Sequence, residues 1–262
     1  MIVVKYGGHA MVEDSLAKDF ASDVVALSRS GEQVVVVHGG GPQIEAALKD
    51  RGLTSKSAAG LRVTTPEMMD VVEMVLTGRV LRDVTNSIIQ AGGQGIGITG
   101  RDGQLLVAEK LTRSATGESI DVGQVGEIVR VNKAVLLSLL NSGFIPVVAP
   151  VSADNDGIAY NVNADSAAGA IAGAMGAKRA IFLTDVPGLL GKWPDVSTLL
   201  SEITYEEAKK LLPSLADGMI PKIGACLHAI DHGAQSAQIV DGRIPGILSH
   251  ALKANVGTVI TR

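Results

Sequence analysis

A run of four valines followed by glycines constrains this chain more than any other stretch. Residues 34–37 are all valine, which is the pattern of a strand buried on both faces of a parallel sheet. His38 and the glycines of 39–41 end the run, and an amphipathic helix is expected over 43–50. Glycines let backbone N–H groups approach a ligand with no side chain between, and a helix N-terminus favours anions. The stretch therefore predicts a site for anionic oxygen; a plain connection between a strand and a helix is the alternative.

The chain opens with a similar arrangement. Ile2–Tyr6 is a short β-type run followed by Gly7 and Gly8, and a helix is predicted from His9 to residue 28. Its apolar side chains recur at three- and four-residue spacing, at Leu16, Phe20, Val24 and Leu27. The first forty residues thus predict a right-handed βαβ unit whose two glycine turns lie at the same edge of the sheet.

Composition narrows the class of protein. The 262 residues are 46% hydrophobic, which suffices for one large α/β domain or for two lobes sharing a sheet. Only 3% are aromatic and the formal net charge is −4, so neither nucleic acid nor an anionic membrane is an expected partner. The single cysteine, Cys226, excludes an internal disulfide. With no signal peptide at Met1 and no apolar run of membrane-spanning length, a cytoplasmic protein is expected.

A second long helix is predicted over 66–90, with Thr65 as its N-cap and Pro66 at its first position. The helix is heavily apolar, so it can bury a second face. Two interpretations stay open at this point. The helix pairs with the same helix of a second copy in a homodimer, or it is fully buried within one chain.

Residues 95–100 match the glycine pattern of a dinucleotide-binding motif, and Asp121 lies about twenty residues further on. The context contradicts that reading. Such a motif opens a helix, whereas this one runs into a turn at Arg101-Asp102-Gly103 and then into a β-type stretch. A dinucleotide-dependent dehydrogenase is therefore not expected.

Further strands and helices follow along the chain. Hairpins are predicted over 105–128 with a turn at 116–118, and Asn161 to Asp165 lead into an alanine- and glycine-rich helix ending near Gly176. The alternation of strands and helices then restarts, with strands expected at 180–183, 238–240 and 259–260 and helices at 204–212 and 223–232. Because no linker separates them, residues 1–176 and 177–262 are predicted to be two lobes that share one continuous sheet.

Two lysines beside glycine-rich turns indicate which chemistry the chain can perform. Lys5 ends the first strand, and Lys222 precedes a helix in the second lobe. Fixed cations beside backbone N–H groups suit the oxygens of a phosphoryl group in transfer. For each lysine alone, a solvated surface charge is the alternative. The sequence contains neither a P-loop nor the catalytic signatures of a protein kinase, which excludes both classes.

Six short segments occur in an order that is specific even though each alone is weak. They are Lys5-Tyr6-Gly7-Gly8, His38-Gly39-Gly40-Gly41-Pro42, Gly60-Leu61-Arg62-Val63-Thr64, Asn161-Val162-Asn163-Ala164-Asp165, Leu183-Thr184-Asp185-Val186-Pro187-Gly188 and Gly218-Met219-Ile220-Pro221-Lys222. Together they resemble the amino acid kinase family over almost the whole chain.

The resemblance implies an α/β fold, a three-layer αβα sandwich with a mainly parallel eight-stranded central sheet. It places the amino-acid substrate on the lobe of residues 1–176 and ATP on the lobe of residues 177–262. The implied reaction moves the γ-phosphoryl group of ATP, with Mg²⁺ bridging the phosphates, to the side-chain carboxylate of N-acetyl-L-glutamate in arginine biosynthesis. That acceptor is already ionised at neutral pH and needs no general base. The long helix would pair with its symmetry mate in a homodimer.

The resemblance also assigns roles to single residues, each at a matching motif position. The catalytic residues would be Lys5 and Lys222, which neutralise the phosphoryl group from opposite sides, and Asp165, which orients them. The amino-acid substrate would be held by Gly40, Gly41, Arg62 and Asn161, and the nucleotide by Gly7, Gly8, Thr184, Asp185, Gly188 and Met219. No residue is predicted to bind a metal directly.

Some positions depart from the family pattern, and two other functions stay open. His9 stands where asparagine is expected, and Leu81-Arg82 replaces Asn-Lys, which puts local substrate or dimer contacts in doubt. The extension that accompanies arginine-inhibited hexamers is absent, so a dimer insensitive to arginine is expected. The alternatives are a kinase for aminoadipate or glutamate on a carrier protein, and a non-catalytic regulator that binds an amino acid.

Overall fold

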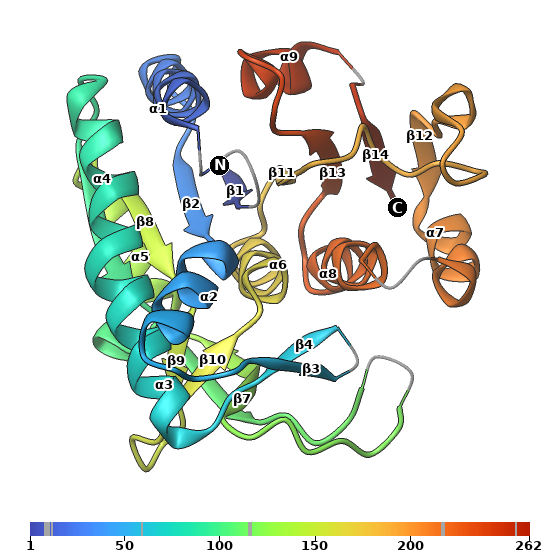
Figure 1. Ribbon diagram of the computed structural model, residues 1–262. Helices are drawn as coiled ribbons and strands as arrows, with labels where there is room; N and C mark the ends of the chain where they lie inside the picture. The colour runs from blue at the N-terminus through green and yellow to red at the C-terminus, as the bar shows by residue number, and fades with distance from the viewer. Residues whose placement is uncertain (8–10, 12, 59, 115–116, 216–217, 255) are drawn as a thin grey trace.

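An eight-stranded sheet runs through both halves of the chain (Figure 1). The structure, a computed structural model, describes residues 1–262 except 8–10, 12, 59, 115–116, 216–217 and 255. In sheet order the strands are β12 (Glu202–Thr204), β14 (Thr258–Thr261), β13 (Ser236–Asp241), β11 (Arg179–Thr184), β1 (Ile2–Tyr6), β2 (Val34–His38), β8 (Ile145–Ala149) and β5 (Gly95–Thr99). All neighbours run parallel except β13 and β14, so the predicted, mainly parallel sheet is confirmed.

Helices cover both faces of this sheet. One face carries α1 (Asp14–Arg29), α2 (Gly41–Asp50), α3 (Pro66–Glu73), α4 (Leu81–Gln90) and α9 (Ile247–Lys253), and the other α5 (Lys133–Asn141), α6 (Ala164–Ala174), α7 (Tyr205–Leu211) and α8 (Ile220–Asp231). The valines of β2 alternate between the two cores: Val34 and Val36 face the first set of helices, and Val35 and Val37 the second. The three-layer αβα sandwich is therefore confirmed.

Smaller elements extend from the sandwich. A closed four-stranded barrel contains β6 (Leu106–Lys110), β7 (Val125–Val131), β9 (Val151–Ala153) and β10 (Ala159–Val162). Short 3₁₀ turns lie at Asp102–Gln104, Val196–Thr198 and Leu212–Ser214. Strands β6 and β7 pair antiparallel, as the predicted hairpin requires, although Thr116 lies outside the described residues. A short hairpin follows α2, in which β3 (Lys56–Ala58) pairs with β4 (Leu61–Val63) across Gly60, whose φ is +75°.

The predicted long helix is continuous but not uniform. Helix α3 passes through a π-helical segment, η2 (Met74–Val80), into α4, and Thr65 caps the start by accepting a hydrogen bond from the Met68 N–H. The π-helical segment was not predicted. It lies against residues 39–41, the glycine loop that follows β2, since a Cβ added at Gly40 would be 2.6 Å from the Leu76 Cδ2 atom.

The glycine pattern at 95–100 forms strand β5 rather than a helix start, which confirms that it is not a dinucleotide motif. The glycines of β5 allow this strand to pack closely against α4. A Cβ added at Gly97 would lie 2.8 Å from Thr85 Oγ1 and 2.9 Å from Leu81 Cγ, so a larger residue would push the helix away.

Two helix starts differ from the predictions. Helix α1, predicted from His9, begins at Asp14, after a Glu13 whose backbone is extended at φ −97° and ψ 121°; His9 lies outside the described residues. Helix α8 begins at Ile220, so Lys222 lies in its first turn and not in a preceding loop. Pro221 suits this turn because the first residues of a helix have N–H groups without intrahelical partners.

The two halves of the chain contribute adjoining halves of the sheet. Strands β5, β8, β2 and β1 precede residue 176, and β11, β13, β14 and β12 follow it, so one continuous sheet is confirmed. The exact lobe boundary stays a prediction. Across the junction, the Asp23 carboxylate of α1 accepts hydrogen bonds of 3.0 Å from the Leu248 N–H and the Ser249 hydroxyl of α9. Among the described residues, no helix is both long and apolar enough to span a membrane.

Candidate active site

The glycine turns after β1 and β2 lie side by side at the carboxyl edge of the sheet. The strand register pairs Tyr6 with His38, and the Gly39 N–H donates a 2.7 Å hydrogen bond to the Tyr6 carbonyl. A Cβ added at Gly39 would be 3.6 Å from the Gly7 Cα atom. The prediction that both turns share one edge is confirmed, and this edge is where parallel α/β sheets bind ligands.

Two lysines from different halves of the chain meet on one carboxylate. Lys5 Nζ of β1 lies 3.1 Å from Asp165 Oδ1, and Lys222 Nζ of α8 lies 3.5 Å from Asp165 Oδ2. Lys5 and Asp165 are buried, and Lys222 is partly buried. The structure therefore brings together the three residues that were predicted to be catalytic.

Close contact between α6 and α8 explains how these residues meet. A Cβ added at Gly169 would lie 2.6 Å from the Ala225 carbonyl oxygen, and one added at Gly173 would lie 3.1 Å from that of Ala229. Gly169 meets Ala225, and Gly173, one turn later, meets Ala229, so α6 and α8 run parallel. Figure 1 shows the two helices side by side. Both N-termini therefore lie at the same edge, where their partial positive charges favour an anion.

Asp165 is held as a carboxylate. Burial alone raises the pKa of this carboxyl, but the charges and hydrogen bonds of Lys5 and Lys222 outweigh burial and hold the pKa below its ordinary value. Helix α6 is capped by Asn163 and not by Asp165: the Asn163 Oδ1 atom accepts from the N–H groups of Asp165 (2.8 Å) and Ser166 (3.1 Å). The Asp165 side chain is thereby free to hold the two lysines.

A cleft of about 310 Å³ opens next to this cluster. The predicted residues that line it are Lys5, Gly7, Gly40, Gly41, Arg62, Asn161 and Asp165. The predicted substrate-binding residues thus surround one cavity together with Lys5 and Asp165.

Arg62 reaches the cleft from the β3–β4 hairpin. Its Nη1 donates hydrogen bonds of 2.6 Å to Glu45 Oε2 and Ser55 Oγ, and its Nη2 lies 3.4 Å from the Gly41 carbonyl oxygen. These contacts hold the planar guanidinium group in a fixed position, from which it can bind a carboxylate with two hydrogen bonds. Asn161 of β10 is oriented by a 3.3 Å hydrogen bond from its Nδ2 to Thr64 Oγ1, where β10 enters the cleft wall.

The predicted nucleotide residues of the second half lie at the same edge but outside this cleft. Lys5 pairs with Phe182, so Thr184 ends β11 next to the first glycine turn, where its hydroxyl donates to Asp185 at 3.2 Å. Met219 precedes the first turn of α8. A Cβ added at Gly188 would lie 2.6 Å from the Thr258 hydroxyl, so this glycine permits close contact with β14. Gly8 lies outside the described residues.

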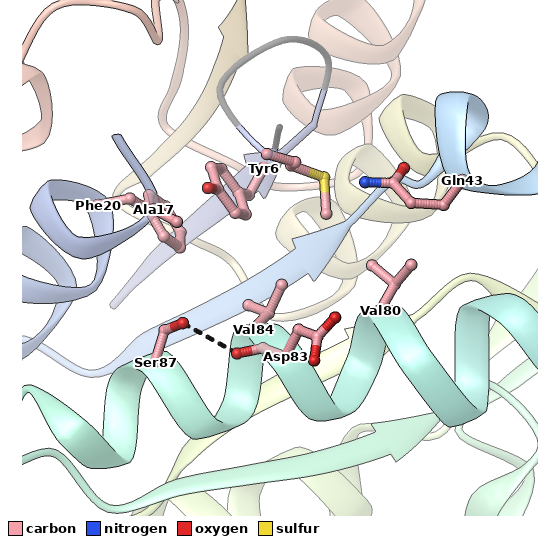
Figure 2. A pocket seen from close by; sticks show the side chains of 9 residues that line it. Tyr6, Ala17, Phe20, Gln43, Val80, Asp83, Val84 and Ser87 are labelled. Carbon is pink, nitrogen blue, oxygen red and sulfur yellow. Dashed lines mark hydrogen bonds between the residues drawn. The ribbon is translucent and has the colours of Figure 1, made fainter. Parts of the chain in front are cut away.

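A smaller pocket of about 60 Å³ lies on the opposite face of β1, between α1 and the long helix. Figure 2 shows Tyr6, Phe20, Val84 and Ser87 around it; the Tyr6 and Phe20 rings stack at a centroid distance of 3.7 Å. Burial raises the pKa of the Tyr6 hydroxyl, which stays protonated. Because successive side chains of a strand point to opposite faces, Tyr6 points away from the cleft that Lys5 enters. This pocket therefore belongs to the core and not to the site.

Two residues of the site were not predicted to have a role. Asn163 caps α6, and its signal was an asparagine just before a helical stretch. His38, which precedes the glycine loop, is wholly buried, and its Nδ1 lies 2.7 Å from the Gly39 carbonyl oxygen.

A parallel sheet whose edge combines a glycine loop, two helix N-termini and a pair of lysines defines an α/β enzyme that handles anionic ligands. The sequence model of the amino acid kinase family matches residues 1–241, and the chain belongs to this family.

Named relatives agree with the family. The chain is 48% identical to "Acetylglutamate kinase" of Acidothermus cellulolyticus over 265 residues, covering 99% of this chain and 90% of that protein. It is also 48% identical to "Acetylglutamate kinase" of Saccharopolyspora erythraea over 261 residues, covering 99% of this chain and 86% of that protein.

Solved structures share the fold. The smu.665 protein of Streptococcus mutans UA159 matches with a TM-score of 0.83 and 28% identity, covering 99% of this chain and 98% of that chain. N-acetylglutamate synthase of Neisseria gonorrhoeae, with coenzyme A and N-acetyl-glutamate, matches with a TM-score of 0.85 and 23% identity. That match covers 100% of this chain but 59% of the synthase chain, so it shows the fold alone.

Proposed function

We propose that this protein transfers the γ-phosphoryl group of ATP to the side-chain carboxylate of N-acetyl-L-glutamate, a reaction of arginine biosynthesis. The observation that carries the phosphoryl-transfer chemistry is the pairing of Lys5 and Lys222, from separate halves of the chain, on the Asp165 carboxylate. The identity of the acceptor is supported by relatives at 46–49% identity that are named acetylglutamate kinase. Their name favours a free acetylated amino acid over the carrier-bound alternative.

The chemical difficulty of this reaction is electrostatic. A carboxylate oxygen forms a bond to the γ-phosphorus while the bond from that phosphorus to the bridging oxygen of ADP breaks, so one anion must approach another. The acceptor is ionised at neutral pH, so no proton has to be removed. Lys5 and Lys222 neutralise the phosphoryl oxygens, and their fixed positions reduce reorganisation during transfer. Asp165, already paired with both, acts as their counter-ion and not as a base.

Each side of the site then has a distinct task. Arg62 binds the α-carboxylate of the acceptor with two hydrogen bonds, Asn161 holds its main-chain end, and Gly40 and Gly41 offer N–H groups to the reacting carboxylate. On the second half, Thr184, Asp185, Gly188 and Met219 border the nucleotide, with Gly7 and Gly8 at its phosphates.

Magnesium enters this scheme with the nucleotide. The described residues contain no group of three or more His, Cys, Asp or Glu side chains placed to hold a metal, and Asp165 already has two cationic partners. These side chains do not form a resident metal site. Mg²⁺ is therefore a part of the substrate, MgATP, with phosphate oxygens and water as its ligands.

The protein also forms a homodimer in this proposal. Ile89 of α4 and Met74 of η2 expose 51% and 50% of their surface, although the opposite side of this long helix is buried. A large apolar side chain on the outer face of a helix is suited to an interface with a second copy. The cytoplasm as the location stays a prediction from composition.

The proposal is tested by measuring ADP release with ATP and free N-acetyl-L-glutamate, glutamate, or glutamate on a carrier protein. Turnover with free N-acetyl-L-glutamate is expected. Lys222→Met should lower kcat about 100-fold or more, because charge stabilisation of the transferring group is lost. The control is Lys210→Met, an exposed lysine of α7, which should keep wild-type kcat. Turnover only with the carrier-bound acceptor, or equal kcat in both variants, would contradict the proposal.

A further inference from the structure

His38 is a buried titratable group next to the site that the proposed reaction does not use. It is the last residue of β2, directly before the glycine loop, and none of its surface is exposed. Its Nδ1 lies 2.7 Å from the carbonyl oxygen of Gly39. Its Nε2 is buried and has no hydrogen-bond partner in the part of the chain that the structure describes.

These contacts define the protonation state of the ring. A carbonyl oxygen only accepts hydrogen bonds, so the proton must be on Nδ1. A second proton on Nε2 would place a buried cation without a partner, which is strongly unfavourable. Burial accordingly lowers the pKa of His38 to about 4, and the ring is neutral at physiological pH. His38 is therefore an Nδ1-protonated, neutral imidazole.

The hydrogen bond from this ring fixes a peptide group of the loop. The Gly39 carbonyl and the Gly40 N–H belong to one planar trans peptide, so they point in opposite directions. Because the carbonyl is directed at the buried ring, the Gly40 N–H is directed away from it, and Gly40 lines the cleft. The other side of Gly39 is also fixed, by the hydrogen bond of its N–H to the Tyr6 carbonyl. Without such contacts, consecutive glycines would rotate between many conformations.

We propose that His38 is a positioning residue: its Nδ1–H group holds the Gly39–Gly40 peptide in the orientation that presents the Gly40 N–H to an anion in the cleft. Which anion this is rests on the proposed function, in which it is an oxygen of the reacting carboxylate or of the phosphoryl group. The orientation of the peptide does not depend on it.

The protonation state is tested first, without any assay of activity. The full-length protein is labelled with ¹⁵N-histidine, and long-range ¹H–¹⁵N spectra are recorded from pH 5.5 to 8. His38, identified by the signals missing from His38→Asn, should show a protonated Nδ1 and an unprotonated Nε2 at every pH. A ring protonated at Nε2, or a ring that titrates in this range, would overturn the proposal.

Two amide variants show whether residue 38 positions the Gly39–Gly40 peptide or only fills the space of the ring. The asparagine amide of His38→Asn lies near the place of Nδ1 and can donate to the same carbonyl, whereas the glutamine amide of His38→Gln lies near the place of Nε2. His38→Asn should keep kcat within about threefold, and His38→Gln should lose about tenfold or more. The KM for ATP should stay within about twofold in both, since most of the proposed nucleotide contacts, Thr184, Asp185, Gly188 and Met219, lie on the other half. Equal losses in the two variants would show that the ring only fills space.

A binding readout covers the case in which the proposed function fails. With ¹⁵N-glycine labelling, inorganic phosphate should shift the Gly40 amide signal in the wild type and in His38→Asn, and shift it much less in His38→Gln. An equal shift in all three proteins would refute the positioning role, whichever substrate the enzyme uses. Absence of turnover with N-acetyl-L-glutamate, together with the expected shifts, would refute only the proposed function.

Discussion

His38 has a consequence for stability that follows from its lowered pKa. An ordinary histidine has a pKa near 6.5, and that of His38 is about 4 because burial disfavours the charged ring. Below pH 6.5 the unfolded chain therefore binds a proton that the folded protein does not. The stability that this neutral ring contributes is complete above pH 6.5 and is lost as pH falls towards 4, by about 3 kcal/mol in all.

Urea unfolding of the wild type and of His38→Asn between pH 4.5 and 7.5 checks this expectation. Other groups titrate equally in both proteins, so the difference between their free energies of unfolding isolates residue 38. This difference should change in favour of the asparagine variant as pH falls. Two curves that run parallel over the whole range would contradict a buried, neutral His38.

At the scale of single residues, the sequence indicated the two lysines of the site but not the roles of the residues beside them. Lys5 and Lys222 were noted because each lies beside a glycine-rich turn, and their catalytic role came from the resemblance to the family; the structure brings both to the Asp165 carboxylate. The cap formed by Asn163 was not assigned, because Asp165 two residues later is an equally good capping residue. The role of His38 depends on a hydrogen bond to its own neighbouring residue and on complete burial, and neither property is visible in a sequence.

At the scale of elements, the contact between α6 and α8 sets the separation of Asp165 and Lys222. Gly169→Ala would place a Cβ 2.6 Å from the Ala225 carbonyl oxygen, which is main chain and cannot rotate away. The helices must separate, so the free energy of unfolding should fall by about 1–3 kcal/mol. Lys222 moves away from Asp165 at the same time, and kcat should fall about tenfold or more.

Gly224→Ala on α8 is the matched control for Gly169→Ala. A Cβ there meets no atom within 4 Å, and the residue is inside the helix, so alanine should stabilise the protein by about 0.5–1 kcal/mol. Thermal unfolding and kcat of both variants check the pair of expectations. If the two alanine substitutions act alike, close contact between these helices does not position the site.

The elements that were predicted correctly are those with a strong and local pattern. Strands β1, β2 and β8 are mainly apolar runs because both faces of the sheet are covered, and α7, predicted over 204–212, begins with a capping box of Thr204 and Glu207. Strands β3 and β12, of three residues each, are too short to show a period. The π-helical segment η2 was missed because the apolar spacing of its sequence resembles that of an ordinary helix.

At the scale of the whole molecule, α4 lies at the outer margin of the sandwich, as Figure 1 shows, with Ile89 exposed. We expect a mass of about 54 kDa in solution by light scattering, twice the 27.0 kDa of one chain. Ile89→Glu should shift this mass towards that of one chain, because a charge would be buried in an apolar interface. Val196→Glu, at a position 67% exposed in the other half, should leave the mass unchanged. A wild-type mass of one chain would contradict the dimer.

The junction of β1 and β11 joins the two halves of the molecule by main-chain hydrogen bonds, with Ile2 to Lys5 opposite Arg179 to Phe182. The halves are therefore not two bodies on a flexible tether. Any relative motion between the two halves, which are proposed to hold acceptor and nucleotide, has to proceed as torsion of a continuous sheet. The spacing of the Lys5 and Lys222 ammonium groups is consequently set by β1 within this sheet and by the packing of α8 against α6, and substrates must adapt to that spacing.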